Sequence, residues 1–455
     1  MAWQQGNHTL ASETLAKLDP VRKHGNHYKL LHFAVKLNDL SLCQKLITEY
    51  ELSPNDYCQS AKSKETPVHL AAKLGHLQIL TYLHQEAQGD LNASQDLKND
   101  PWTPLMAAAE ANQVESIQYL LDKKVDTSPI FGFSPTPLHI AAERNNPDAI
   151  RTLLAGGAMV NQLFCPKKRI TPLHVACSHG FYESAKVLLE FEADPDTTNG
   201  QGETSLHLAC KGLQSDLIHL LINKYDANVT ARDQEGRTPL HFLLNSKLGG
   251  KRECIEILFK SIANSETMFK RKTEEDIINM ADKHGWTPLH YAAYNGRTKS
   301  LQFLIENKAD LGLKNKAGQS GLNFAVKYLP AATIDALENM LDKSIQCQSL
   351  DSPDGNLTLS FDSIAPPASS TKDRSRSNVQ MFYELLPLIE QGRQKSKAAK
   401  ILLHPLSQCY LHLKWSQVQL IYYLILFCHF VYSACYTAYS IIMFRVLCRH
   451  PEDNR

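Results

Sequence analysis

Apolar residues recur along the first three quarters of the chain at the spacing of short amphipathic helices, which come in pairs separated by polar turns. In the first helix of a pair a Leu precedes small Ala residues, as Leu138 precedes Ala141. The second helix carries adjacent leucines, as at Leu120-Leu121, Leu153-Leu154, Leu188-Leu189 and Leu220-Leu221. Turns such as Gly156-Gly157 and Asn199-Gly200 follow. The pattern predicts an all-α array of helix pairs over residues 28–343, after an N-terminal segment 1–27.

A phrase of the form Thr-Pro-Leu-His-x-Ala opens the first helices. Nearly unaltered copies begin at Thr66, Thr136, Thr171 and Thr287, and weaker copies begin at Lys29, Thr103, Thr204, Thr238 and Ser320. Successive starts are 37, 37, 33, 35, 33, 34, 49 and 33 residues apart. The Thr hydroxyl is suited to cap a helix, and Pro fits the first turn, where its missing N–H costs nothing. The nine copies resemble the ankyrin repeat, and the resemblance implies a solenoid in which stacked neighbours bury their apolar faces jointly.

A row of histidines occupies one position of this phrase. Its members are His32, His69, His139, His174, His207, His241 and His290, while Met106 and Asn323 take the same position in two repeats. Residues at one repeat position lie about one repeat apart, so they do not converge on a metal ion. The ankyrin resemblance implies that each His hydrogen-bonds Thr and neighbouring backbone. We therefore expect a structural row and no metal site.

The step from Thr238 to Thr287 is 49 residues, which is 49 − 33 = 16 more than the usual step. The extra residues fall between 245 and 282. Two interpretations stay open, a solvated longer loop and a projection that binds a partner.

A charge-free apolar segment runs from Leu420 to Phe444. As a helix, its 25 residues would rise about 37 Å, against a hydrocarbon core of roughly 30 Å. The segment predicts one transmembrane helix, placed at residues 416–444, with a short tail at 445–455. A buried globular helix is the alternative.

Between the repeats and this segment the composition changes twice. Residues 344–378 are rich in Ser, Asp, Pro and Thr, which indicates a flexible linker. Residues 379–415 have helical spacing of apolar positions, with a basic stretch around Lys395 and Lys400 suited to anionic lipid headgroups.

Charge and cysteine content narrow the function classes. The 48 Lys and Arg against 47 Asp and Glu give a net charge of +1, which suggests no nucleic-acid partner. The opening residues lack an apolar stretch, so we expect the repeats in the cytosol with reduced thiols among the 11 Cys. The sequence contains no phosphate loop, nucleophile elbow, kinase motif or zinc constellation. We expect no enzyme activity, no cofactor and no bound metal.

The residues just before the apolar segment carry a second resemblance. They are His404, Pro405, Tyr410, Leu411, Lys414 and Trp415. This order resembles the segment that leads into the first transmembrane helix of ankyrin-type transient receptor potential (TRPA) channels, and the short repeat ladder is similar to the pyrexia-like members. Lys414 and Trp415 also suit a generic cytoplasmic membrane anchor.

The TRPA resemblance implies the N-terminal cytosolic sensing and assembly portion of a non-selective cation channel in the plasma membrane. It implies a homo- or hetero-tetramer with full-length channel subunits, and electrophile-sensing thiols, for which Cys347 and Cys409 are candidates. Such channels have six spans and a pore loop, whereas this sequence shows one span, so we expect no ion-pore residues in it.

A different function stays open beside the channel. A single-span, membrane-tethered ankyrin scaffold would bind protein partners on its concave face and touch membrane lipid, without conducting ions. A palmitoyltransferase would need an Asp-His-His-Cys core, which the sequence lacks.

Overall fold

The computed structural model describes residues 28–56, 65–94, 102–128, 135–165, 167–245, 252–264, 277–307 and 309–346, together with 431, 433 and 436–441. These residues form two compact units, Met1–Tyr291 and Ala292–Arg455, and each is considered by itself. The described part contains helices, turns and two isolated bridges, Phe164 with Ile170 and Lys314 with Ser320.

The helices alternate between two positions of a repeated pair. The first helices are α2 (Tyr28–Lys36), α4 (Pro67–Leu74), α6 (Pro104–Glu110), α8 (Pro137–Glu143), α10 (Pro172–His179), α12 (Ser205–Lys211), α14 (Pro239–Asn245), α17 (Pro288–Tyr294) and α19 (Gly321–Tyr328). The second helices are α3 (Leu40–Thr48), α5 (Leu77–Gln85), α7 (Val114–Asp122), α9 (Pro147–Ala155), α11 (Tyr182–Glu190), α13 (Ser215–Asn223), α15 (Arg252–Asn264), α18 (Thr298–Glu306) and α20 (Pro330–Gln346). The all-helical array of helix pairs is confirmed.

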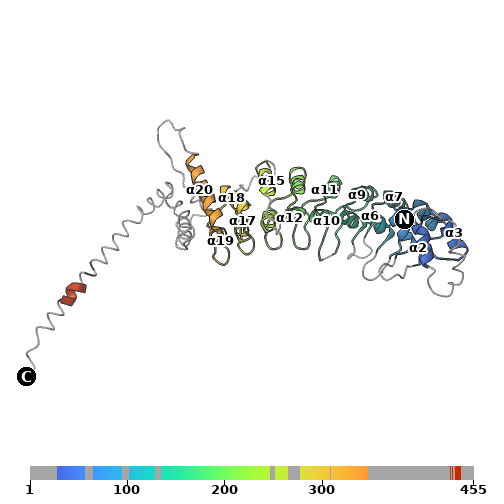
Figure 1. Ribbon diagram of the computed structural model, residues 1–455, viewed down its shortest axis with the longest axis horizontal. Helices are drawn as coiled ribbons and strands as arrows, with labels where there is room; N and C mark the ends of the chain where they lie inside the picture. The colour runs from blue at the N-terminus through green and yellow to red at the C-terminus, as the bar shows by residue number, and fades with distance from the viewer. Residues whose placement is uncertain are drawn as a thin grey trace, which may run out of the picture. The chain divides into compact units, whose positions relative to one another are not determined.

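In the first unit the helices form two layers. First helices contact first helices of the next repeat, from α2 with α4 to α12 with α14, and second helices contact second helices. Figure 1 shows this unit as two rows, with α7, α9, α11 and α15 along the upper side and α6, α10 and α12 below them. The layers leave one face made of first helices and of the loops that precede them.

Local sequence explains where the first helices begin. Thr66 has an extended backbone, with φ −88° and ψ 163°, and its hydroxyl accepts from the His69 amide while Pro67 takes the first turn. Gly75 ends the helix in the left-handed conformation, at φ 76°. The same Thr cap recurs at Thr103, Thr136 and Thr171, so the predicted cap and the Pro position are confirmed.

The core lies between the layers and between repeats. Leu138, Ala141 and Ala142 of α8 are almost completely buried, as are Ile150 and Leu153 of α9. Burying a side chain the size of Leu or Ile contributes roughly 1.5–3 kcal/mol, and the small Ala residues permit close approach of neighbouring first helices. Each repeat therefore depends on its neighbours for most of its core.

The irregular 49-residue step is partly helical. The second helix in that repeat, α15, has 13 residues, against 9 in α13. The remaining extra residues fall in 246–251 and 265–276, outside the described part of the chain.

The C-terminal expectations fall mostly outside the described residues. α20 continues to Gln346, and 347–430 are not described. Within the apolar segment only residues 431, 433 and 436–441 are described, and these are helical. Among all described residues, no helix combines the length and the apolar character that a membrane crossing requires.

Candidate protein-binding surface

The histidine row ties each repeat to the next one. His69 Nδ1 lies 2.7 Å from Thr66 Oγ1 and 3.4 Å from the Thr66 amide nitrogen, while Nε2 lies 2.8 Å from the Trp102 carbonyl oxygen. A carbonyl only accepts, so Nε2 carries the proton and donates, and Nδ1 accepts from the Thr66 N–H. The ring is neutral and bridges two repeats.

The same bridge recurs along the first unit. His32, His139, His174, His207 and His241 place Nε2 at 2.7, 3.0, 3.1, 3.1 and 3.1 Å from the carbonyl oxygens of Glu65, Ile170, Glu203, Arg237 and Trp286. Burial lowers the pKa of His69, His139 and His241 to about 4 and holds the pKa of His174 and His207 below its usual value. The row is a structural element, as its spacing indicates.

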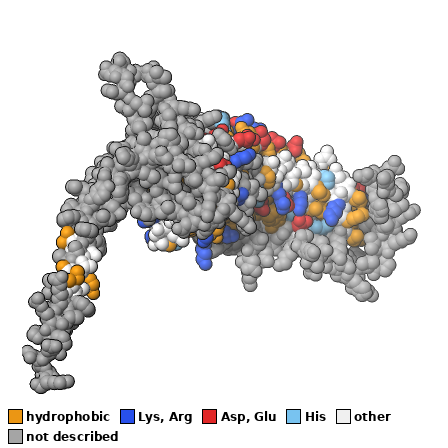
Figure 2. All heavy atoms as spheres, turned by 60° about the vertical axis from the view of Figure 1, so that its left-hand side comes forward, with side chains coloured by type: hydrophobic (Ala, Val, Ile, Leu, Met, Phe, Trp, Pro, Cys, Tyr) orange, Lys and Arg blue, Asp and Glu red, His pale blue; other side chains and the backbone are white. Residues whose placement is uncertain are grey.

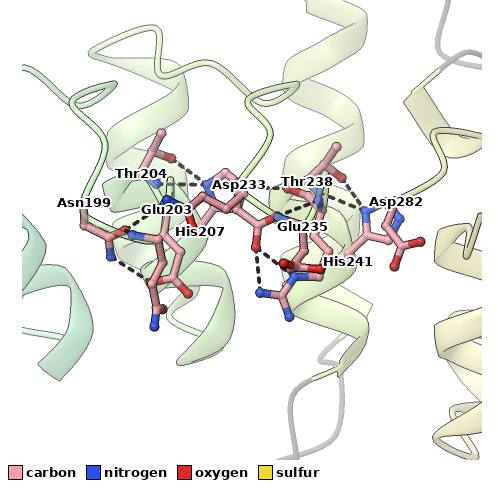
Figure 3. Close-up of polar contacts among 12 residues, drawn as sticks. Asn199, Glu203, Thr204, His207, Asp233, Glu235, Thr238, His241 and Asp282 are labelled. Atoms are coloured by element: carbon pink, nitrogen blue, oxygen red, sulfur yellow. Dashed lines mark hydrogen bonds and ion pairs between the residues drawn. The ribbon is translucent and has the colours of Figure 1, made fainter. Parts of the chain in front are cut away.

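In the first unit, three loops before first helices share one construction, and we call them the regular fingers: residues 199–203, 233–237 and 282–286 (Figure 3). Residues 315–319 of the second unit repeat it, with Asn315 as the accepting side chain. In the middle one, Asp233 Oδ1 accepts from the amides of Glu235 and Arg237 at 2.9 and 2.7 Å. Asn199 and Asp282 accept from the equivalent amides, and the fourth residues, Gly202, Gly236 and Gly285, have φ of 78°, 76° and 77°. In each regular finger the first amide also donates to the carbonyl of the fifth residue, at 2.9, 3.0 and 2.9 Å, and the first side chain reinforces this backbone closure.

Asp233 also forms an ion pair with Arg237. Its Oδ2 is 2.8 Å from Arg237 Nε and 2.7 Å from Nη2, and the Asp233 side chain is only 1% exposed. The guanidinium lies 4.7 Å from the centre of the Phe242 ring, over its face. Burial lowers the pKa of Arg237, but the hydrogen bond and the charge of Asp233 outweigh it and raise that pKa. In this finger the charges of Asp233 and Arg237 therefore neutralise each other.

Another loop of the first unit is built differently, and we call its described residues, 164–165 and 167–170, the long finger. Phe164 and Ile170 exchange backbone hydrogen bonds of 2.9 and 3.1 Å, which span two residues more than the Asn199-to-Glu203 closure. The Arg169 amide donates to the Cys165 carbonyl at 2.7 Å, with both residues at positive φ, 47° and 58°. Lys167, Lys168 and Arg169 are exposed, and no carboxylate in the described part forms an ion pair with them.

The fingers hydrogen-bond to one another along the array. Gly200 N donates to Lys168 O at 2.6 Å, Gln234 N to Gln201 O at 2.9 Å, and Lys283 N to Glu235 O at 2.8 Å. The contact at Gly200 is so close that an added Cβ would lie 1.9 Å from the Lys167 carbonyl oxygen. The long finger is thereby fixed against the first regular finger.

Ion pairs cross the first-helix face further toward the N-terminus. Lys73 Nζ lies 3.5 Å from Glu65 and 3.2 Å from Glu110, and Arg144 Nη2 lies 2.7 Å from Glu110. Burial lowers the pKa of Lys73, but the hydrogen bond to Glu110 and the charges of both Glu residues raise it on balance. Because these side chains are partly exposed, the network contributes little stability.

Sequence comparisons match the repeats. A family model described as "Ankyrin repeats (3 copies)" matches residues 31–130, 124–199 and 191–270, and "Ankyrin repeat" matches 284–316, which is more than half of the chain. The chain belongs to the ankyrin-repeat family. Its all-helical ankyrin solenoid is the fold of protein-interaction proteins and of channel proteins.

Relatives of this ankyrin-repeat chain include Inversin, Rabankyrin-5 and a cation channel. Inversin from dog is 30% identical over 54% of this chain and 21% of its own length. The transient receptor potential cation channel subfamily A member 1 of Drosophila melanogaster is 25% identical over 63% and 24%, and human Rabankyrin-5 is 29% identical over 40% and 15%. The chain thus spans about a quarter or less of these relatives. The Bcl-3 ankyrin domain aligns with TM-score 0.43 and 24% identity, over 53% of this chain and all of that one.

Thiols within the described part of the ankyrin repeats are mostly buried. Cys43 and Cys177 are fully buried, and burial raises the pKa of each thiol to about 12, with a smaller contribution from Asp39 at Cys43. Burial also raises the pKa of Cys210. Cys165, on the long finger, is half-buried. The candidate sensor thiols Cys347 and Cys409, and the motif His404, Pro405, Tyr410, Leu411, Lys414 and Trp415, lie outside the described residues.

The finger residues are the functional candidates that sequence reasoning missed. Asn199, Asp233, Asp282 and Asn315 each precede Gly by three residues and Thr or Ser by five. That recurrence was readable, because an Asx side chain and a left-handed Gly are the residues that a tight turn requires. The greater length of the long finger is visible in the sequence, because the step from Thr136 to Thr171 has 35 residues, two more than the usual 33.

Proposed function

We propose that the ankyrin repeats bind other proteins through the fingers and the first-helix face, which the family resemblance identifies as concave. One observation carries the proposal: a hydrogen-bonded row of fingers holds exposed side chains in fixed register along the first unit. A surface that is ordered before binding loses less conformational freedom on association, so its contacts translate more fully into affinity.

Within that role, we propose that the chain is the cytosolic sensing and assembly portion of a TRPA-like non-selective cation channel. Support comes from the order of segments in the sequence, which is ankyrin repeats, the predicted linker at 344–378, the His404-to-Trp415 motif within 379–415, and the predicted transmembrane helix at 416–444. The matches to subfamily A member 1 channels of fly and human, at 25% and 29% identity, agree with it. The channel would be tetrameric and would lie in the plasma membrane, with the repeats in the cytosol.

A membrane-tethered ankyrin scaffold is the second candidate. It is favoured by Inversin and Rabankyrin-5, whose identities of 30% and 29% equal or exceed those of the channels. The same surface would serve it, without ion conduction.

Electrophysiology combined with co-purification separates these functions. The 455-residue chain is expressed in cultured cells alone and with a tagged full-length TRPA channel subunit. We expect it to co-purify with that subunit from detergent extracts and to change the amplitude of the cation current. Membrane localisation without co-purification or a change in current would contradict the channel role and favour the scaffold.

A further inference from the structure

We propose that the long finger binds a short acidic segment of a partner protein, through Lys167, Lys168 and Arg169. The inference rests on the protein-binding role proposed above and specifies the chemistry of one partner. The three residues are consecutive and exposed, and no carboxylate forms an ion pair with them in the described part of the chain.

The long finger presents its cations from a fixed backbone. The Phe164–Ile170 bridge closes it, and the Gly200 amide holds Lys168 O at 2.6 Å from the next finger. Phe164 anchors its base by packing edge-on against the buried ring of His139, with ring centres 5.5 Å apart. A loop held at its base, middle and tip keeps three charges close together despite their mutual repulsion.

The Asp233 finger shows how this chain can compensate a finger cation internally. Arg237 is paired with the buried Asp233, and His284 lies 3.6 Å from Glu235. Next to the long finger, by contrast, the first regular finger offers Gly200 and Gln201 at its tip, while its one acid, Glu203, is buried and accepts from Asn199 at 2.8 Å. Within the described part of the chain, no carboxylate neutralises the long finger, so its three cations are available to carboxylates of a partner.

The charge pattern favours a peptide over a membrane surface. Polybasic sites for anionic lipid contain about four to eight Lys or Arg residues, and the long finger has three. Two fingers further along, Glu235 is half exposed, so a flat anionic surface laid across the tips would meet a like charge. A short run of Asp or Glu fits the three cations, because Arg169 offers a planar fork to one carboxylate while the lysines act as point charges.

The finger tips beside the long finger carry uncharged side chains, which limits the length of the acidic run in the partner peptide. Gln201 and Gln234 present amides at the next two tips, and the latter donates to Gly200 O at 2.9 Å. An extended peptide along the row advances roughly 3.3 Å per residue. We therefore expect its acidic residues over the long finger and uncharged polar residues beyond it.

Charge reversal tests the inference on the full chain in a non-ionic detergent. The probe is a fluorescein-labelled peptide with a run of Glu flanked by Gly and Ser, and a Gln-for-Glu peptide serves as the reference. K167E/K168E is expected to weaken binding of the Glu peptide by at least about tenfold, as reversal of a charge pair does at an interface. Added salt should weaken wild-type binding, because these charges are exposed.

The matched control is K123E/K124E, which reverses two consecutive exposed lysines after α7 that also lack an ion pair. It should leave the affinity within about twofold, and both variants should keep the wild-type helical signal and unfolding midpoint. Equal loss in both variants, or equal binding of the Gln peptide, would overturn the proposal. So would binding of the wild type to phosphatidylserine vesicles without binding of the Glu peptide. Co-purification with channel subunits tests the proposed channel role separately, so either proposal can fail alone.

Discussion

The long finger and the Asp233 finger occupy equivalent positions two repeats apart, yet they treat charge in opposite ways. Asp233 closes its turn through two backbone amides and pairs with Arg237, so its carboxylate is buried and used. The long finger closes through its backbone alone and directs three cations to solvent. Both fingers share a backbone closure, and the long finger shows that the first side chain need not reinforce it. Because the side chains of the long finger are not needed to close the loop, they are available to bind a partner.

Acidification should have the largest effect, because it acts on both finger types through the histidine row. His139 bonds the long finger at Ile170, and His207 bonds the Asp233 finger at Arg237. The pKa of His139 is about 4 when folded, against 6.5 in the unfolded chain. Protons therefore bind the unfolded state first, and stability is lost as pH falls from about 6.5 toward 4, by roughly 1–3 kcal/mol for His139. The pKa of His207 is also lowered by burial, so its contribution has the same sign.

Urea unfolding midpoints between pH 7.5 and 4.5 check this expectation. A double variant, H139Q/H207Q, should start less stable and show a shallower fall with pH. An unchanged slope in the variant would mean that carboxylates, not these histidines, cause the acid sensitivity.

Removing the Asp233 carboxylate should disrupt the Asp233 finger and leave the long finger unchanged. Asp233→Ala leaves two amides and the partly buried Arg237 guanidinium without their partner, at a cost of about 2–4 kcal/mol. Asp233→Asn keeps an oxygen for the amides and should lose about half as much. Denaturant titration measures both. The comparison variant is Asp148→Ala, whose exposed partner Arg151 lies 3.7 Å away, and it should cost less than about 0.5 kcal/mol.

Separating the two finger types should have the smallest effect. Gly200→Ala places a methyl group against the Lys167 carbonyl, so the long finger must move away, at a cost of about 1–3 kcal/mol. The amide at position 200 donates to Lys168 O in the wild type, and its hydrogen exchange should accelerate in the variant. Gln201→Ala, which changes only an exposed side chain, should leave that exchange rate unaltered.

The sequence predicts repeated structure well because each repeat restates the same local rules. Thr66, Pro67 and His69 contain the cap, the helix start and the bridge within four residues, and copies confirm one another. Local reading does not reveal contacts that depend on stacking. Lys73 meets Glu110 across 37 residues, and Gly200 touches Lys167 only because two fingers lie side by side. The long finger's extra residues are visible in the spacing, but their exposure follows from its closure at Phe164 and Ile170.

The placement of Cys165 has a practical consequence for labelling. Cys43, Cys177, Cys210 and Cys254 are fully buried, whereas Cys165 is half-buried within the long finger. Within the described part of the chain, a maleimide dye should therefore attach fastest at a position two residues from the exposed cations. Among the described cysteines, Cys165 is therefore the position from which we expect an attached dye to report on the long finger.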